Sequence, residues 1–319
     1  MTYLKKKCNV PVEKGYINTG VLEERGVLSA ASSLDDEHCI SLGNKIKLKR
    51  REVESASSLH KLIFHPYDYV MEYCLEIKDK QIADPNNVEN VKGTVFHKFI
   101  EKMFMDGAQV RSMDDVKGMI HSRDNMDRMF EECVDDCGII LREPQFASAF
   151  MEVKERIMGG MGALVRIIEK NELIVKGCEV VYDNVPFVTY EGEDIKLRGS
   201  IDMVLEDKAG DVVVFDFKYS AGTYYEGLLK ENKSVQLAVY RHFMKGKNVR
   251  AAYIFLKGMR GVSTDTFTNY IRQVKPRESV DMMQFVKDRY IGRWKELDTG
   301  NIDCSGEDYK YSKYKDLIK

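Results

Sequence analysis

An acid and a base stand two positions apart in the apolar run VFDFKYS, at Asp216 and Lys218. Because alternate side chains of a β-strand share a face, these two point the same way, while Phe215 and Phe217 point into a core. The preceding run, KLRGSIDMVLED, carries Asp202. If the two runs pair as strands through the turn KAGD, Asp202 and Asp216 face each other on one surface.

Two converging carboxylates repel each other unless a proton or a cation neutralises them. Mg²⁺ prefers oxygen ligands and commonly binds one or two carboxylates together with waters and phosphate oxygens. Lys218 would partly neutralise the pair and would orient a water or stabilise charge on a phosphate. Asp202, Asp216 and Lys218 therefore suit metal-assisted hydrolysis of a phosphodiester. A buried Asp–Lys ion pair at a strand end explains the same residues equally well.

The segment GTVFHKFIEKMF is expected to form an amphipathic helix that begins at Gly93. Its His97 and Glu101 are four residues apart and share one side of the helix. The apolar stripe of this helix comprises Val95, Phe96, Phe99, Ile100, Met103 and Phe104. His97 lies at the border of the stripe, where it can offer a ring nitrogen to a metal, although a packed core histidine is commoner.

A second helix is expected from about Ser234 to Met244, directly after the strands. Its Gln236 and Tyr240 lie one turn apart, so both can bind a backbone phosphate or support the site. A polar helix face accounts for the pair as well. Arg198 shares the strand face of Asp202 by parity, and we expect it to contact DNA or to support the site.

Changes in the residue pattern along the chain indicate the elements that must position these residues. Residues 1–50 are weakly patterned and are predicted to be a leader or linker, with one short strand near Ile46 to Leu48. Residues 51–319 are predicted to form one α/β domain with a central mixed β-sheet flanked by helices.

Within this domain, three parts are distinguished by their periodicity. A helical part is predicted for about 55–172, starting with a Ser-capped helix and containing an insertion near 105–172 that the glycines at 159–162 interrupt. A sheet core with a meander of strands is predicted for about 173–260, and C-terminal helices for about 277–319.

The composition is that of a globular chain of 319 residues, with 44% hydrophobic and 31% charged residues. Its net charge is −2, so a nucleic-acid partner would have to be held by local basic patches such as KIKLKRRE, which a solvated segment explains at least as well. Seven irregularly spaced cysteines argue against a disulfide framework and favour a reducing cytoplasm. We expect a cytoplasmic protein with no membrane partner, because no apolar run reaches the length of a membrane span.

Four motifs, taken in order, resemble the RecB-type branch of the PD-(D/E)XK nuclease superfamily. That branch has G-x-x-x-H on a helix, G-x-x-D at a strand end, D-x-K on the next strand and Q-x-x-x-Y on a helix. The matching segments here are Gly93 to His97, Gly199 to Asp202, Asp216 to Lys218, and Gln236 to Tyr240. The resemblance runs from about Ser55 to the C-terminus, and the stretch SASSLHKLIFHPYDYVMEY is similar to the helical start of AddB-like and CRISPR-associated members.

The resemblance implies a restriction-endonuclease-like core and a role for each motif. The implied ligands of Mg²⁺ or Mn²⁺ are the side chains of His97, Asp202 and Asp216 and the backbone carbonyl of Phe217. Lys218 would be the catalytic lysine, and Gln236 and Tyr240 would bind DNA or hold the site. Glu101 occupies a position that is often acidic in the family, with a less defined role.

One departure from the family concerns an iron–sulfur cluster, which AddB-like members hold with one cysteine before a proline and three near the C-terminus. The corresponding positions here are His65, Tyr309, Ser312 and Ile318. Because cluster iron is bound mostly by cysteine thiolates, no iron–sulfur cluster is expected. Cys74 and Cys304 lie within several residues of these positions and leave a rearranged site open.

The sequence thus predicts a Mg²⁺-dependent DNA nuclease, an exonuclease that processes DNA ends in repair or recombination. DNA is the expected substrate and a separate helicase subunit the candidate partner. The alternative is a catalytically silent DNA-binding or scaffolding subunit of a helicase–nuclease complex, against which the intact Asp202, Asp216 and Lys218 argue. A hydrolase of RNA or nucleotides on the same core is less favoured.

Overall fold

The structure is a computed structural model that describes residues 39–41, 48–77, 88–220, 222–303, 312 and 314. The chain divides into two compact units: Met1–Arg51 with Lys61–Ile77 and Arg289–Lys319, and Glu52–His60 with Lys78–Asp288. Most of the strand predicted near Ile46 to Leu48 lies outside the described residues. Among the described helices, none is both long and apolar enough to cross a membrane.

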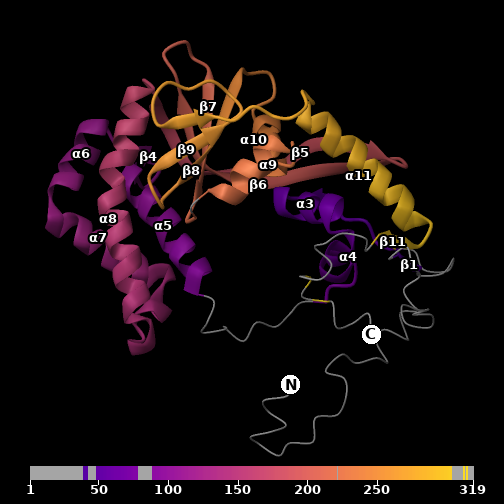
Figure 1. Ribbon diagram of the computed structural model, residues 1–319, viewed down its shortest axis with the longest axis horizontal. Helices are drawn as coiled ribbons and strands as arrows, with labels where there is room; N and C mark the ends of the chain where they lie inside the picture. The colour runs from indigo at the N-terminus through magenta and orange to yellow at the C-terminus, as the bar shows by residue number, and fades with distance from the viewer. Residues whose placement is uncertain are drawn as a thin grey trace, which may run out of the picture. The chain divides into compact units, whose positions relative to one another are not determined.

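The larger unit is built on a seven-stranded sheet in the order β10-β9-β8-β7-β6-β2, with β5 also paired to β6 (Figure 1). The strands are β2 (Val53–Glu54), β5 (Ile174–Tyr190), β6 (Glu193–Glu206), β7 (Val212–Lys218), β8 (Val249–Phe255), β9 (Arg260–Ser263) and β10 (Ile271–Gln273). β5, β6 and β7 form the predicted antiparallel meander, whereas β7 pairs in parallel with β8. The predicted mixed sheet is confirmed.

The turn between β6 and β7 fixes the register of the two strands. Asp207 Oδ1 accepts hydrogen bonds from the backbone N–H groups of Ala209 and Asp211, at 2.8 and 3.0 Å, and Gly210 takes a positive φ of 85°. Beyond the turn, Met203 pairs with Phe215. The next residue on each strand is therefore an aspartate, as strand parity predicted.

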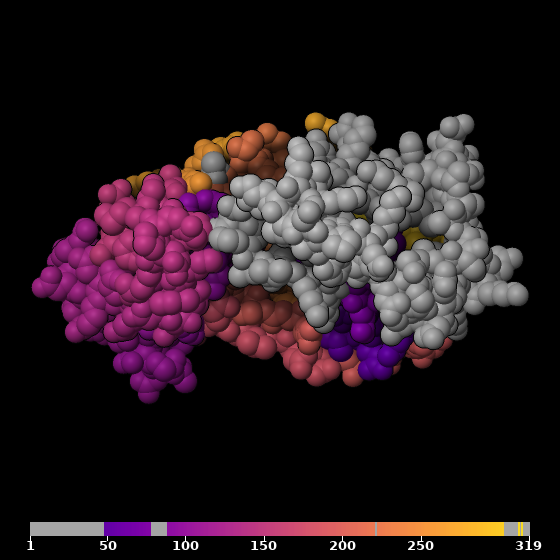
Figure 2. All heavy atoms as spheres, turned by 90° about the horizontal axis from the view of Figure 1, so that it is seen from below, coloured from indigo at the N-terminus to yellow at the C-terminus, as the bar shows by residue number. Residues whose placement is uncertain are grey.

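One face of the sheet is covered by helices whose apolar side chains form the main core (Figure 1). They are α5 (Val88–Phe104), α6 (Met113–His121), α7 (Arg123–Cys137) and α8 (Ala147–Lys170), with the small hairpin β3 (Met105–Asp106) and β4 (Gln109–Val110) after α5. Figure 2 shows the segments of α6 to α8 gathered in one block. All six residues of the predicted apolar stripe are buried, and Phe215 and Phe217 belong to the same core.

Two glycine predictions were wrong. Gly93 does not begin its helix but lies inside α5, and the glycines at 159–162 do not interrupt α8. A Cβ on Gly160 would approach Met259 Cε to 2.7 Å and Leu256 Cδ1 to 2.9 Å, so this glycine lets α8 pack closely on the chain after β8. Close packing, rather than a helix break, explains it.

The opposite face of the sheet carries α9 (Thr223–Lys230) and α10 (Val235–Phe243). α10 is the predicted helix, whereas α9 was not predicted. The ring of Tyr225 in α9 lies 4.8 Å from that of Tyr253 and 5.9 Å from that of Phe255, centroid to centroid, which holds α9 against β8. Ser55 caps α3 (Ala56–Phe64) as predicted, since Ser58 N donates to its Oγ at 3.1 Å.

The smaller unit contains short helical segments and the described part of the tail. α4 (Pro66–Tyr69) continues into a π-helix at Val70–Cys74, and β1 (Cys39–Ser41) pairs with β11 (Asn301–Asp303). α11 (Met282–Asp298) is the predicted C-terminal helix. Tyr314 is buried, donates to the carbonyl of Ile77 at 2.8 Å and accepts on its own carbonyl from Tyr67 at 3.0 Å.

Candidate active site

Asp202 and Asp216 are the residues just beyond Met203 and Phe215, the last register pair between β6 and β7, and both are buried. The N–H of Phe217 donates to Asp202 Oδ2 at 2.7 Å, so the carboxylate of one strand is tied to the backbone of the other. Asp216 takes its place in β7 opposite Tyr253 of β8. The two acids that the sequence predicted to converge therefore do so, at the point where the pairing of β6 with β7 ends.

A closed set of polar contacts holds Lys218. Its Nζ lies 2.7 Å from Asp216 Oδ2 and donates to Gln236 Oε1 at 3.0 Å. Gln236 Nε2 donates to Tyr240 Oη at 2.9 Å, and Tyr240 Oη donates to Asp216 Oδ1 at 3.2 Å. Burial alone would lower the pKa of Lys218, but the charge of Asp216, its hydrogen bond to Lys218 and the charges of Tyr225 and Asp202 together raise that pKa, so the ammonium stays charged.

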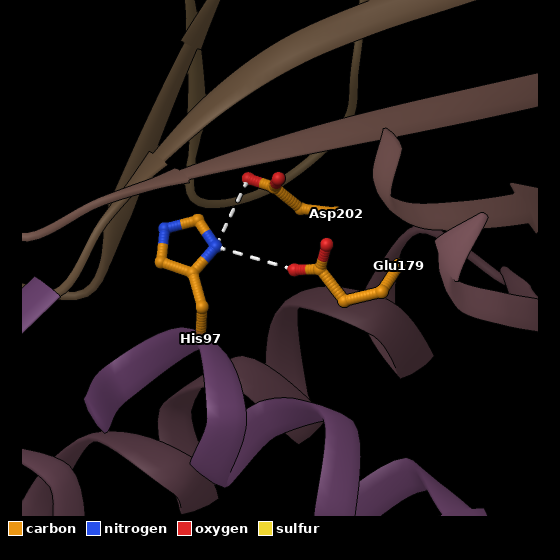
Figure 3. A group of neighbouring side chains, drawn as sticks. All are labelled: His97, Glu179 and Asp202. Atoms are coloured by element: carbon orange, nitrogen blue, oxygen red, sulfur yellow. Dashed lines mark ion pairs between the residues drawn. The ribbon is translucent and has the colours of Figure 1, made fainter. Parts of the chain in front are cut away.

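His97 lies on α5, which packs on the face of the sheet opposite to α10, and its imidazole points toward the acids (Figure 3). Its side chain is 30% exposed, and its Nδ1 lies 3.5 Å from Glu179 Oε1 and 3.6 Å from Asp202 Oδ2. Its Nε2 lies 3.1 Å from the carbonyl oxygen of Phe217. Burial would lower the pKa of the imidazole, but hydrogen bonding to Glu179 and the charges of Asp202 and Asp216 raise it overall.

Glu179 is the site residue that the sequence reasoning missed. It lies in β5 and has a left-handed backbone with φ of 49°, and its Oε2 accepts from Ser200 Oγ at 3.0 Å. Hydrogen bonding to His97 lowers the pKa of Glu179, so it stays ionised. The signal was present as a single acid in the apolar run IVKGCEVVY, but its place depends on the pairing of β5 with β6.

The electrostatics of the site favour a bound cation. Burial, and then the neighbouring charge of Asp216, raise the pKa of Asp202 to about 7. His97, Glu179 and Asp202 each offer one ligand atom, and these atoms lie within 4.8 Å of one another. A divalent cation that prefers oxygen ligands, with one imidazole, fits this donor set, since it would compensate carboxylates that otherwise repel each other.

The geometry divides the expected metal ligands into two groups. His97 and Asp202 come together with Glu179, whereas Asp216 is engaged by Lys218 and Tyr240, and the Phe217 carbonyl faces His97. Asp216 still influences the others electrostatically, because its charge raises the pKa of both Asp202 and His97. The metal ligands expected from the sequence and the cluster with Glu179 therefore have His97 and Asp202 in common.

Two further candidates are not part of the cluster. Glu101 is on α5 one turn after His97, but its carboxylate pairs with Lys98 Nζ at 2.8 Å. Arg198 is exposed on β6, and among the described residues it forms no hydrogen bond or ion pair with the acids. Gln236 and Tyr240 are joined to Lys218 and Asp216, so in this structure they support the site from within.

An open pocket of about 430 Å³ leads to the cluster. Its lining includes Asn90, Gly93, Thr94, His97, Lys218 and Tyr219. A Cβ on Gly93 would have Tyr219 Cβ 4.0 Å away, so the glycine widens the mouth rather than relieving a clash. A pocket of similar size, about 460 Å³, is lined by residues such as Leu237, Arg241 and Met283, and neither His97 nor Lys218 lines it.

Of the four positions that the resemblance assigns to an iron–sulfur cluster, His65 and Ser312 are described, and both belong to the smaller unit. His65 precedes α4, and Ser312 Oγ donates to Asp68 Oδ1. Tyr309 and Ile318, as well as Cys304, lie outside the described residues. In the part of the chain that is described, Cys133, Cys137 and Cys178 are free thiols.

Comparison with curated proteins finds similarity to one component of a bacterial complex. Two proteins from Streptococcus pyogenes, serotypes M49 and M6, each named as a subunit of an ATP-dependent helicase/deoxyribonuclease, are 24% and 25% identical to this chain over 214 residues. Each alignment covers 66% of this chain and 17% of the relative, so the chain spans less than a fifth of the relatives' length.

A family model gives the broader assignment. The model described as the PD-(D/E)XK nuclease superfamily matches residues 54–308, which include His97, Glu179, Asp202, Asp216, Lys218, Gln236 and Tyr240. The mixed sheet with flanking helices agrees with that fold. The chain therefore belongs to the PD-(D/E)XK nuclease superfamily.

Proposed function

We propose that this protein is a Mg²⁺- or Mn²⁺-dependent deoxyribonuclease, an exonuclease that degrades DNA from its ends during repair or recombination. The observation that carries the proposal is the placement of Lys218. Its ammonium is held between Asp216 and Gln236, beside the buried carboxylate of Asp202, and it lines the open pocket. A structural ion pair alone would not require the second buried acid or an opening to solvent.

The residues that would hold the cation are His97 and Asp202, with Glu179 and Asp216 as the remaining acidic donors and the Phe217 carbonyl as a further oxygen. When bound, a hard divalent cation polarises a phosphate oxygen and lowers the pKa of a bound water. Glu179 also keeps the His97 imidazole oriented, because it accepts from Nδ1 when that atom carries a proton.

The side chains of this protein would supply the rest of the chemistry. The charged Lys218 would stabilise the negative charge that builds up on the phosphate during attack by water. Tyr240 and Gln236 would restrict the movement of Asp216 and Lys218, because each donates to or accepts from one of them. Preorganised charges of this kind cost no reorganisation as the reaction proceeds.

The proposed partners are DNA and a separate helicase subunit, because the curated relatives are named as subunits of a helicase/deoxyribonuclease. We place the protein in a reducing cytoplasm, which the free thiols among the described residues support. No iron–sulfur cluster is part of the proposal.

The test is digestion of end-labelled linear DNA and of circular DNA with Mg²⁺ or Mn²⁺, comparing the natural protein with Lys218→Ala. We expect linear DNA to shorten from its ends, circular DNA to persist, and Lys218→Ala to be inactive. Cutting of circular DNA would show that the protein is an endonuclease and not an exonuclease. Binding of DNA without digestion under any of these conditions would favour the scaffolding role instead, and selective digestion of labelled RNA would favour an RNA hydrolase.

A further inference from the structure

We infer that Tyr224 is a stacking platform for an unpaired nucleobase beside the phosphate that Lys218 serves. The inference rests on the proposed function and adds a residue that contacts the substrate. Tyr224 lies in the first turn of α9, and 62% of its surface is exposed.

A short series of aromatic contacts links Tyr224 to the catalytic lysine. The Nζ of Lys218 lies 5.3 Å from the centroid of the Tyr225 ring, and the centroid of Tyr224 lies 5.2 Å from that of Tyr225. The planes of the two tyrosine rings meet at 81°, so they do not stack on each other. A base that stacks on Tyr224 would thus belong to a nucleotide close to the one being cut.

The position of Tyr224 is fixed by the backbone rather than by chance exposure. Gly222 immediately precedes α9 with φ of 91°, and a Cβ there would approach Phe255 Cε2 to 2.5 Å. Only glycine satisfies both conditions, and it sets α9 against β8 with Tyr225 packed on Tyr253 and Phe255. Tyr225 is therefore the anchor of this turn, which leaves Tyr224 at the surface beside the site.

The chemistry of the occupant follows from the ring. Every base has a π-face, so an exposed aromatic ring binds single-stranded nucleic acid with little regard for sequence. A base inside a duplex already stacks on both neighbours and would have to unpair first. Tyr224 would therefore favour a substrate whose bases are unpaired at the cleavage position, such as a frayed or unwound DNA end.

The experiment measures binding without cleavage, in the Lys218→Ala background with Mg²⁺ present. Fluorescence anisotropy of a labelled single-stranded oligonucleotide would be compared for the native Tyr224, Tyr224→Ala, Tyr224→Phe and Tyr224→Trp. We expect Tyr224→Ala to weaken the affinity roughly five- to 150-fold, the range for losing one base–aromatic stack. Tyr224→Phe and Tyr224→Trp should stay within about twofold, because the ring rather than the hydroxyl makes the contact.

A scan with a single abasic site moved along the oligonucleotide identifies the stacked base. One position should weaken binding when Tyr224 is present and should have no effect in Tyr224→Ala. Tyr270→Ala is the matched control, since Tyr270 is 52% exposed and precedes β10, three strands from β7. Unchanged affinity of Tyr224→Ala, an equal loss in Tyr224→Phe, or an abasic profile that ignores Tyr224 would overturn the inference alone. Absence of DNA binding by the protein with Tyr224 intact would overturn the proposed function as well.

Discussion

The N–H of Phe217 donates to Oδ2 of Asp202, while the carbonyl of Phe217 faces Nε2 of His97 at 3.1 Å. One residue of β7 thus orients an acid from β6 through its N–H and meets a histidine from α5 through its carbonyl. Its ring is buried in the main core, which holds the peptide in place. The orientation of Asp202 therefore depends on the position of the backbone at 217, which the packing of the Phe217 ring sets.

Removal of either member of the Lys218–Asp216 pair should abolish nuclease activity without unfolding the protein. Lys218→Ala takes away the charge that stabilises the phosphate, and Asp216→Ala takes away the group that positions it. We expect a loss of at least about 100-fold in kcat/KM, which is about 2.7 kcal/mol of transition-state stabilisation. Activity within about tenfold of the natural protein, in samples whose circular dichroism is unchanged, would contradict the catalytic assignment.

The ligand role of His97 and Glu179 can be measured through the metal. His97→Ala and Glu179→Gln should each raise the Mn²⁺ concentration that gives half-maximal activity, by roughly tenfold or more, because each removes one donor or its support. DNA affinity should change much less. Glu101→Gln is the matched control, since Glu101 also lies on the His97 side of α5 but pairs with Lys98.

The outcome distinguishes a metal site that includes Glu179 from one that does not. An unchanged half-saturating concentration in His97→Ala would identify the histidine as a packing residue. If Glu179→Gln behaves like Glu101→Gln while His97→Ala does not, the cation would be held without Glu179. Isothermal titration with the metal, in the absence of DNA, gives the same comparison without depending on activity.

Gln236 and Tyr240 should affect turnover more than substrate binding. Gln236 is bonded to Lys218 and Tyr240, and the buried Tyr240 is bonded to Asp216, so the hydrogen bonds of both residues serve the site. Tyr240→Phe and Gln236→Ala should lower kcat about ten- to 100-fold with KM for DNA nearly unchanged. A rise in KM with an unchanged kcat would instead identify a direct phosphate contact.

A prediction about pH concerns the ion pairs of the nearly buried Lys92, whose Nζ lies 2.6 Å from Glu89 Oε1 and 2.6 Å from Glu152 Oε2. Hydrogen bonding to Lys92 lowers the pKa of Glu152. The ionised Glu152 therefore stabilises the folded protein above the usual pKa of 4.5, and this stabilisation is lost as the pH falls through the lowered pKa. Burial acts to lower the pKa of Lys92, but its two carboxylate partners raise it overall, so its contribution is lost only as the pH rises beyond 10.5.

Lys92→Met should therefore lower the denaturation midpoint at pH values between 4.5 and 10.5. The difference in midpoint between this variant and the natural protein should shrink below pH 4.5. The control is Lys208→Met, because Lys208 and its partner Glu172 are 71% and 60% exposed and such pairs contribute little. A difference between natural protein and Lys92→Met that is constant from about pH 3 to about pH 8 would show that Lys92 acts through packing alone.

Protein purified without oxygen should be colourless and should contain no stoichiometric iron or sulfide. Packing in the smaller unit should take the place of a cluster. Tyr314→Ala should then lower the free energy of unfolding by about 3–5 kcal/mol, as for other buried aromatic residues, and Tyr314→Phe by only about 1 kcal/mol. Broad visible absorbance together with matching amounts of iron and sulfide would show this prediction to be wrong.

The sequence revealed the parts of the site that depend on local periodicity. Strand parity placed Asp216 and Lys218 on one face, and the border position of His97 followed from the apolar stripe of α5. Glu179 could not be found in this way, because its place depends on how β5 aligns with β6 and on a residue with positive φ. Register between strands is set by packing and bulges, which a single sequence reports poorly.

The predictions of helix ends and breaks at glycines failed for a related reason. Helix propensity disfavours glycine inside helices, so Gly93 and the glycines at 159–162 suggested ends or breaks. Tertiary packing outweighs that cost in α5 and α8. The unpredicted α9 is only eight residues long and includes Gly227, so its stability comes mostly from the contacts of Tyr225 with β8 rather than from its own sequence.

The close approach of α8 to the chain after β8 has an evolutionary consequence. Leu256 N donates to the carbonyl of Lys218 at 3.0 Å, so displacement of Leu256 would shift the backbone of the lysine. A larger residue at position 160 meets both Leu256 and Met259. Met259 meets position 160 with the flexible end of its side chain, which can swing aside, whereas Leu256 is joined through its backbone to Lys218, so position 160 accepts only residues that leave Leu256 in place.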